Sequence, residues 1–168
     1  MERLDEFRSL AIDFARERFK EVGELMPTAF VFYTNLKGET TLVLAKPPAD
    51  FNHETKKGWY DGLRLMVRSL LADGVSKDTI AVLFMLESWI ASVPVDSDLA
   101  NLPSPSEMPQ REEVVVITAE TATRESMHLM PIRRYDDCVR LGDVETKLDA
   151  VKGDANASIY GAASRIIP

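Results

Sequence analysis

The sequence predicts an α+β fold in two layers, with a largely antiparallel sheet of about five strands and two amphipathic helices on one face of it. Three observations lead to this prediction. Two segments repeat apolar residues at helical spacing, and most strand-like segments come in pairs separated by turn sequences. Strands also outnumber helices and do not alternate with them, so the parallel sheet of an α/β protein is not expected.

Residues 1–23 and 50–74 are the two expected helices. Gly23 and Gly74 stand where each helix should end, because glycine readily adopts the left-handed backbone conformation of a helix terminus. The apolar stripes consist of Leu4, Phe7, Ala11, Phe14 and Val22 in the first helix and of Trp59, Leu63, Met66, Val67, Leu70 and Leu71 in the second. Each stripe predicts one buried face and one solvated face.

Gly58 and Gly62 lie four residues apart in the second helix. Each weakens the helix by about 1 kcal/mol relative to alanine. Their spacing favours the close approach of another backbone, and a ligand against the helix is the less favoured alternative.

Five segments are expected to be strands. Residues 29–34 and 39–46 form one hairpin, and residues 112–119 and 126–133 form a second. Residues 80–86 are an unbroken apolar run, which is typical of a central strand that is covered on both faces. With both helices on one face, the other face needs the C-terminal segment or a second copy of the protein as its cover.

Residues 1–141 are expected to form one α+β domain. Residues 142–168 contain small residues and glycines with only a weak helical pattern. We expect this segment to be a C-terminal arm docked on the sheet or on a partner subunit, or a partly disordered tail.

The composition favours a soluble cytoplasmic protein. With 45% hydrophobic and 28% charged residues, the chain resembles an ordinary globular protein, and no apolar run approaches the length that spans a membrane. The mixed charges of the N-terminus are unlike a signal peptide. Cys138 is the single cysteine, which excludes an internal disulfide and fits a reducing compartment. The net charge of −7 disfavours a nucleic-acid partner, since phosphate binding needs clustered Lys and Arg.

The sequence contains no catalytic, cofactor-binding or metal-binding motif that we assign. His53, His128 and Cys138 are too few for a structural zinc site, and His128 is expected to be a packed strand residue. The glycine-rich phosphate loops and the G-x-S-x-G elbow are absent, so no cofactor is expected.

Clustered carboxylates leave one enzymatic alternative open. Nucleases that hold Mg²⁺ often place an acidic residue upstream of an E-x-K triplet on a strand. Glu145 and Lys147 form such a triplet, with Asp136 or Asp137 upstream. Triplets of this kind also arise by chance in a chain rich in Glu and Lys.

The most informative stretch joins two of the predicted strands through a long proline-rich loop. Glu87 and Trp89 share one face where the central strand leaves its apolar run. Arg111 stands just before the next strand, so Glu87 and Arg111 are expected to approach one another and anchor the loop, with Trp89 packed under its prolines. A ligand site is the less favoured alternative. The candidate interaction or loop-anchor residues are Glu87, Trp89, Pro105, Glu107, Pro109, Arg111 and Glu113.

This stretch resembles a family of uncharacterised bacterial and phage proteins. In that family a similar E-x-W strand end is followed by a P-S-E-x-P-x-R-x-E segment that leads into a strand. The likeness covers roughly Ala81 to Glu120, with weaker likeness in the two helices. It implies that the seven candidate residues belong together, and it implies no activity.

We therefore expect a non-enzymatic binding or assembly protein that acts through the proline-rich loop and an oligomeric sheet face. It would be a homo-oligomer, with a different protein partner left open. The alternative is a metal-dependent hydrolase or nuclease built on Glu87, Glu107 and Glu113 or on residues 136–147. A third idea is an acidic inhibitor that occupies a partner's nucleic-acid site.

Overall fold

The computed structural model describes residues 2–52, 54–94, 96–152 and 166–168. The helices are α1 (Glu2–Val22) and α2 (Lys56–Ala72), with short 3-10 turns η1 (Lys77–Thr79), η2 (Leu99–Asn101) and η3 (Pro105–Glu107). The strands are β1 (Thr28–Thr34), β2 (Thr40–Ala45), β3 (Ala81–Ala91), β4 (Arg111–Glu120), β5 (Arg124–Arg134), β6 (Val139–Leu141) and β7 (Glu145–Val151). The predicted α+β class is confirmed.

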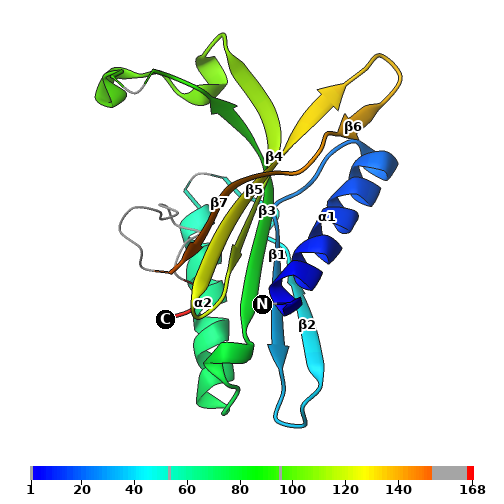
Figure 1. Ribbon diagram of the computed structural model, residues 1–168, viewed down its shortest axis with the longest axis vertical. Coiled ribbons are helices and arrows are strands. Elements are labelled where there is room, and N and C mark those ends of the chain that lie inside the picture. Colours follow the sequence, from blue (N-terminus) through cyan, green and yellow to red (C-terminus); the bar gives the residue numbers. More distant parts are fainter. Residues whose placement is uncertain (1, 53, 95, 153–165) are drawn as a thin grey trace.

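All described strands belong to one antiparallel sheet, drawn in Figure 1. The strand order is β2-β1-β3-β4-β5-β6, and β7 also pairs with β5. The sheet thus has seven strands where about five were expected. The additional strands, β6 and β7, come from the region after residue 135, where the sequence pattern is weak. The expected central position of residues 80–86 is confirmed, because β3 lies between β1 and β4.

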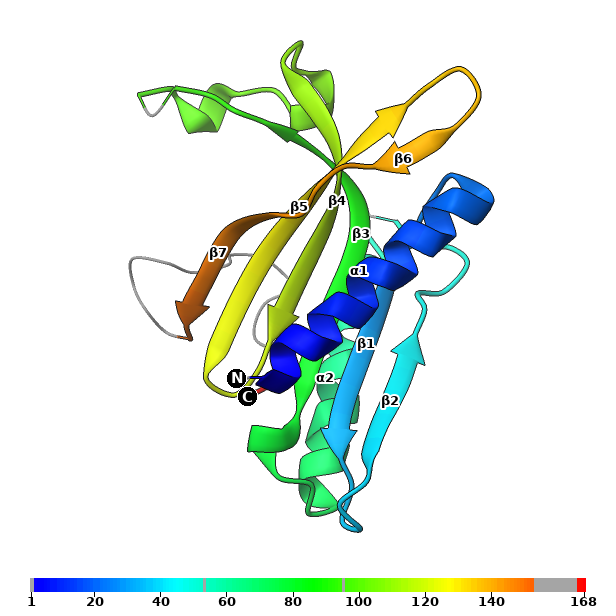
Figure 2. The ribbon, with the colours of Figure 1, turned by 45° about the vertical axis from the view of Figure 1, so that its right-hand side comes forward.

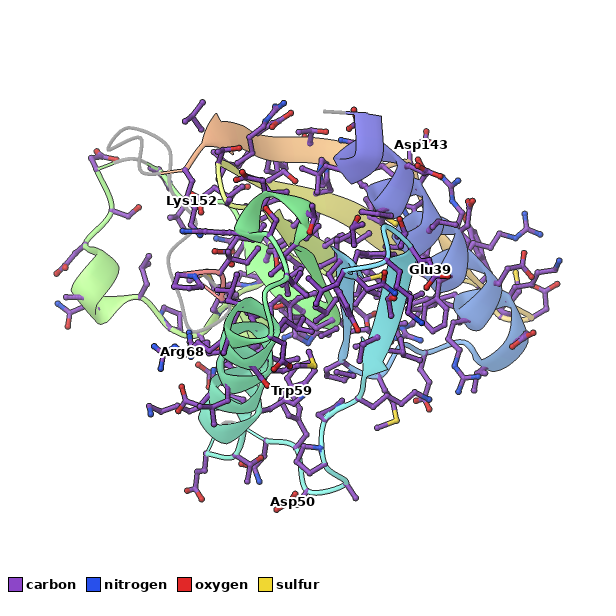
Figure 3. The ribbon with its side chains drawn as sticks, turned by 90° about the horizontal axis from the view of Figure 1, so that it is seen from below. Glu39, Asp50, Trp59, Arg68, Asp143 and Lys152 are labelled. Carbon is purple, nitrogen blue, oxygen red and sulfur yellow. The ribbon has the colours of Figure 1, made fainter. Side chains whose placement is uncertain are left out.

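The two helices pack on opposite faces of the sheet, not on one face as expected. Side chains alternate between faces along a strand. Phe30 and Leu83 belong to the core cluster under α1, whereas Val31 and Val82 belong to the cluster under α2. Figures 2 and 3 show α1 and α2 on either side of the strands. Because consecutive residues of β1 and β3 are apolar, both faces need a cover, and each helix supplies one.

The second face of the central strand therefore needs no second copy of the protein. Ala81, Val82, Leu83, Phe84 and Met85 are all buried within the chain itself. This removes the reason for expecting an oligomer built on an open sheet face.

The C-terminal segment contributes to the sheet and to the core. Residues 145–151 are β7, and Ile166 and Ile167 are buried in the cluster under α2. The backbone N–H groups of Ile166 and Ile167 donate to the Glu120 carboxylate over 2.8 and 3.3 Å. Residues 153–165 lie outside the described part of the chain.

The predicted C-terminal ends of the helices and the first hairpin are confirmed, whereas the second helix begins at Lys56 and not at residue 50. Gly23 and Gly74 have positive φ angles of 76° and 90°, which glycine adopts without the clash of a Cβ atom. In the turn between β1 and β2, the Asn35 side-chain oxygen accepts hydrogen bonds from the backbone N–H groups of Lys37 and Glu39. This side chain replaces missing backbone partners and sets the register of the hairpin.

The sheet divides into two ribbons beyond its core, at the top of Figure 1. Pairing of β3 with β1 ends at Met85, and pairing of β4 with β5 begins at Val114. Residues 87–113, called the arm from here on, therefore leave the sheet as a two-stranded ribbon closed by the proline-rich loop. The β5–β6 hairpin forms the other ribbon.

Candidate functional site

The base of the arm is a group of charged residues from three separate parts of the chain. Arg134 on β5 donates two hydrogen bonds to the Glu113 carboxylate, from Nε over 2.7 Å and from Nη2 over 2.6 Å. Its Nη2 atom also lies 3.9 Å from Oε2 of Glu87. The other Glu87 oxygen accepts the backbone N–H of Leu25 over 2.5 Å. The base of the arm is thus tied to β5 and to the segment between α1 and β1.

The two carboxylates in this group have opposite pKa shifts. Burial raises the pKa of Glu87 above its ordinary value, the Leu25 N–H opposes the shift, and the nearby charge of Glu113 adds to it. The hydrogen bonds from Arg134 hold the pKa of Glu113 below its ordinary value. The same contact raises the pKa of Arg134. Arg134 therefore pairs chiefly with Glu113 and leaves Glu87 only weakly compensated.

The expected contact between Glu87 and Arg111 is wrong. Glu87 lies opposite Val115, whereas Arg111 lies opposite Ala91, four residues further along β3. A strand rises about 3.3 Å per residue, so this offset separates the two side chains by roughly 13 Å. Arg134, and not Arg111, is the arginine that lies beside Glu87.

Arg111 instead covers Trp89 further out on the arm. Its guanidinium carbon lies 4.9 Å from the centre of the Trp89 ring, which is a cation–π geometry. The two residues are diagonal neighbours across β3 and β4, on one face of the ribbon. Arg111 also donates a hydrogen bond to the backbone oxygen of Ser106. Arg111, rather than the prolines, is therefore the side chain shown to stack on Trp89, and it links the tryptophan to the loop.

The loop has local structure of its own. Pro105 begins η3, and the Glu107 carboxylate accepts the backbone N–H of Ser104 over 3.1 Å. Met108 is buried although its neighbours, including Pro109, are exposed. These contacts fold the loop back towards the strands of the arm.

The seven predicted residues thus fall into two groups instead of one. Glu87 and Glu113 meet at the base of the arm, and Trp89 and Arg111 meet further out, close to the loop that carries Pro105, Glu107 and Pro109. Arg134 and Leu25 were not predicted as partners of these residues. The register of the second hairpin was the available signal for Arg134, since Glu120 pairs with Glu125 and this places Glu113 one diagonal step from Arg134.

The carboxylates proposed for a hydrolase or nuclease, Glu87, Glu107 and Glu113 or those of residues 136–147, do not form a metal site. Within the described residues, no three His, Cys, Asp or Glu side chains are close enough to hold a metal ion. Glu107 is occupied with the loop backbone, and Glu145 pairs with Lys147 on β7. The hydrolase or nuclease alternative stays a prediction.

His128 is fully buried, as expected for a packed strand residue. Its Nε2 atom lies 3.1 Å from Ser126 Oγ, and its Nδ1 atom lies 3.0 Å from Thr146 Oγ1. Burial lowers the pKa of His128, and the charge of Arg8 lowers it further. The ring is therefore a neutral, hydrogen-bonded part of the core at neutral pH. His53 lies outside the described residues.

A cavity of about 510 Å³ lies between the first turns of α1 and the turn that joins β4 to β5. Arg8 and Arg124 line it, and each is paired with a carboxylate, Asp5 at 2.9 Å and Asp149 respectively. Ser126 contributes a buried hydroxyl to the wall. Both arginines of the cavity are already paired with a carboxylate, and we assign the cavity no function.

Fold and site together define an α+β protein with helices on both faces of an antiparallel sheet and a two-stranded arm that projects from it. No family model, curated protein or solved structure matches the chain. The resemblance of residues 81–120 to uncharacterised bacterial and phage proteins thus stays a prediction. Neither α1 nor α2 meets the length and apolarity that crossing a bilayer requires, and no other described helix does.

Proposed function

We propose that this protein is a non-enzymatic binding protein whose arm engages a partner. The proposal rests mainly on one observation: the arm leaves the core as a two-stranded ribbon held by its own contacts and by Arg134. Figures 1 and 2 draw it projecting from the body. An isolated two-stranded ribbon is marginal in water. The contacts at Glu113, Trp89 and Glu107 preorganise it, which lowers the entropy cost of binding.

The chemistry of the arm favours a partner with a basic surface. Trp89 is 39% exposed, and tryptophan and arginine are the side chains most enriched in binding hot spots. Arg111 is the one basic residue of the arm. The exposed acidic residues of the arm are Asp96, Asp98, Glu107 and Glu112. A partner would then meet an aromatic side chain on an arm whose exposed charges are mainly acidic.

Self-association remains part of the proposal, but through the edge of the sheet and not through an open sheet face. The open sheet face that motivated it is covered by α1 and α2. The expected cytoplasmic location and a bacterial or phage origin also remain proposals, supported respectively by the single cysteine and by the resemblance of residues 81–120.

The test removes the loop without disturbing the sheet. Ala91 and Arg111 lie directly opposite one another, so residues 92–110 can be replaced by Asn-Gly, the preferred two-residue hairpin turn. A photo-crosslinking residue at Ser106 in the intact protein would report on partners in a lysate of the source cell. We expect cross-linked partners that are lost when Trp89 is changed to Ala and that diminish as salt is raised.

The control is Lys57→Ala, a change on the exposed surface of α2. This variant should capture the same partners as the wild type. The shortened-loop variant, added in excess, should not compete with the wild type or with Lys57→Ala for these partners. A partner set that is unchanged by Trp89→Ala would contradict the proposal. A shortened-loop variant that fails to fold would also contradict it, because the loop would then be a structural part of the core.

A further inference from the structure

Between Thr40 and Ala45, the edge strand β2 contains none of the residues that usually prevent edge-to-edge pairing, and Lys46, Pro47 and Pro48 follow only after it. Among the described strands it pairs only with β1, and it forms the outer border of the sheet in Figures 1 and 2. Edges are commonly protected by charges, prolines or bulges within the strand. The strand reads Thr-Thr-Leu-Val-Leu-Ala, and its register with β1 is unbroken from Thr40 to Ala45.

Two leucines of this edge are exposed side by side. Leu42 is 49% exposed and Leu44 is 45% exposed. They lie opposite Phe32 and Phe30, on the face of the sheet that α1 covers further in. The cover supplied by α1 therefore stops short of the outermost strand.

The backbone of the same residues is directed outwards. Asn35 N–H donates to the Glu39 carbonyl at the end of the hairpin. In an antiparallel pair, inward and outward hydrogen-bonding residues alternate along each strand. Because Glu39 bonds towards β1, residues 41, 43 and 45 also bond to β1. Leu42 and Leu44, which alternate with them, direct their N–H and C=O groups towards the open edge.

We propose that β2 pairs with β2 of a second copy of the protein, in an antiparallel arrangement with a two-fold axis at Val43. A two-fold axis perpendicular to the sheet keeps each face continuous, so directly opposed residues must share a face. Centring the axis on Val43 puts Leu42 opposite Leu44 of the second copy, and Leu44 opposite its Leu42. An axis at Leu42 would leave Leu44 opposite a threonine.

A second copy fits this edge better than an unrelated strand for two reasons. The pattern of β2 is self-complementary about Val43, because the same two leucines supply both sides of the apolar contact. The strand also carries no charge, so this is a surface on which two chains of net charge −7 can meet without placing like charges opposite one another.

The groove on the other face borders the same edge. Its volume is about 660 Å³, and Ala45 of β2 lines it together with Gly58 and Gly62 of α2. A Cβ atom added at either glycine would meet nothing within 4 Å, so among the described residues no other backbone approaches them as their spacing suggested. The added strand would extend the wall of this groove on the β2 side.

Sedimentation equilibrium provides the first test. The wild type should have twice the 18.8 kDa mass of one chain, and L42K/L44K should be monomeric, since four lysines would meet across the axis. Both leucines are exposed, so the double variant should keep the circular dichroism spectrum of the wild type. The matched control is Leu65→Lys on α2, where the leucine is 64% exposed and away from the edge. A monomeric wild type, or a dimeric L42K/L44K, would overturn the proposal.

Disulfide cross-linking tests the register. In the proposed dimer Val43 faces its copy as a non-hydrogen-bonded pair, with Cα atoms about 4.5 Å apart. That separation suits a disulfide. In a Cys138→Ser background, Val43→Cys should oxidise to a covalent dimer, and Leu42→Cys should not, because its copy lies a diagonal step away. Cross-linking of Leu42→Cys without that of Val43→Cys would overturn the proposed axis.

The dimer and the arm are separate proposals. The shortened-loop variant should dimerise like the wild type, and L42K/L44K should retain an intact arm. Loss of partner capture with an intact dimer, or the reverse, therefore identifies which of the two proposals fails.

Discussion

Arg134 holds Glu113 through two parallel hydrogen bonds of 2.7 and 2.6 Å at the base of the arm. This fork-to-carboxylate geometry is the strongest form of surface ion pair, because both donors act on one rigid plane. The Glu113 side chain is only 19% exposed, so solvent screens the contact incompletely. The pair joins β4 to β5 at the point where the two ribbons diverge.

Changing Arg134 to Ala should lower the free energy of unfolding by about 1 kcal/mol at pH 7. The pKa of Glu113 is lowered in the folded protein, so its stabilising contribution is present above the ordinary value of 4.5 and is lost as the pH falls below it. Urea unfolding at pH 7 and pH 3.5 should show the two proteins converging in acid. Arg134→Lys keeps the charge without the fork and should be intermediate. An equal deficit at both pH values would contradict the ion-pair explanation.

Changing Glu87 to Gln should alter the stability by less than about 1 kcal/mol, whereas Glu87→Ala should cost about 1–3 kcal/mol. Glutamine keeps an oxygen acceptor for the Leu25 N–H, and alanine leaves that buried group without one. Because the pKa of Glu87 is raised in the folded protein, its contribution falls as the pH rises through 4.5. Denaturant titrations should therefore show that the free energy of unfolding of Glu87→Gln, relative to that of the wild type, is more favourable at pH 7 than at pH 4.

Changing Arg111 to Ala should loosen the arm while leaving the core intact. The cation–π contact with Trp89 is worth about 0.5–1 kcal/mol at an exposed site, and the bond to Ser106 is lost with it. Limited proteolysis with chymotrypsin should cut the loop faster, and the melting temperature should stay close to that of wild type. A melting temperature lowered as much as by a core substitution would show that the arm unfolds together with the core.

His128 should make the protein less stable as the pH falls from 7 to 5. Its pKa is lowered in the folded state by burial and by Arg8, although Asp5 and Asp149 oppose the shift. The unfolded chain therefore binds the proton more readily, and stability is lost as the pH falls through 6.5. Urea midpoints measured across this range should slope downwards in the wild type and lie nearly flat in His128→Asn. A slope that survives in His128→Asn would assign the effect to another group.

Glu120 should be the most sensitive of the charged positions. Its side chain is 7% exposed and accepts the N–H groups of Ile166 and Ile167 together with the Lys152 ammonium. Glu120→Ala would leave the two N–H groups buried without an acceptor and the Lys152 ammonium with the Ile167 carbonyl alone, at a cost of about 3 kcal/mol or more. Deleting residues 166–168 should have a similar effect, measurable by thermal unfolding. Glu6→Ala, at an exposed position on α1, serves as the control and should change little.

Much of the fold was predictable because local sequence patterns fix local structure. Gly23 and Gly74 mark helix ends, and Asn35 and Gly38 mark a hairpin turn. The unbroken apolar run after residue 80 predicted a strand covered on both faces, since each position along it needs an apolar neighbour. The class, the helices and the five main strands follow from these signals.

Tertiary structure decided which surfaces these elements cover and which side chains meet. The apolar stripes of α1 and α2 predict that each helix has a buried side. They do not predict which face of the sheet each helix packs on, because packing on either face satisfies the same periodicity. Arg134, and not Arg111, lies beside Glu87. The registers of β3 with β4 and of β4 with β5 together decide which side chains of these strands become neighbours. The sequence by itself determined the two helices, the five main strands and the central place of β3. The position of the helices, the pairing of β6 and β7 and the charged base of the arm depended on contacts between residues far apart in the chain.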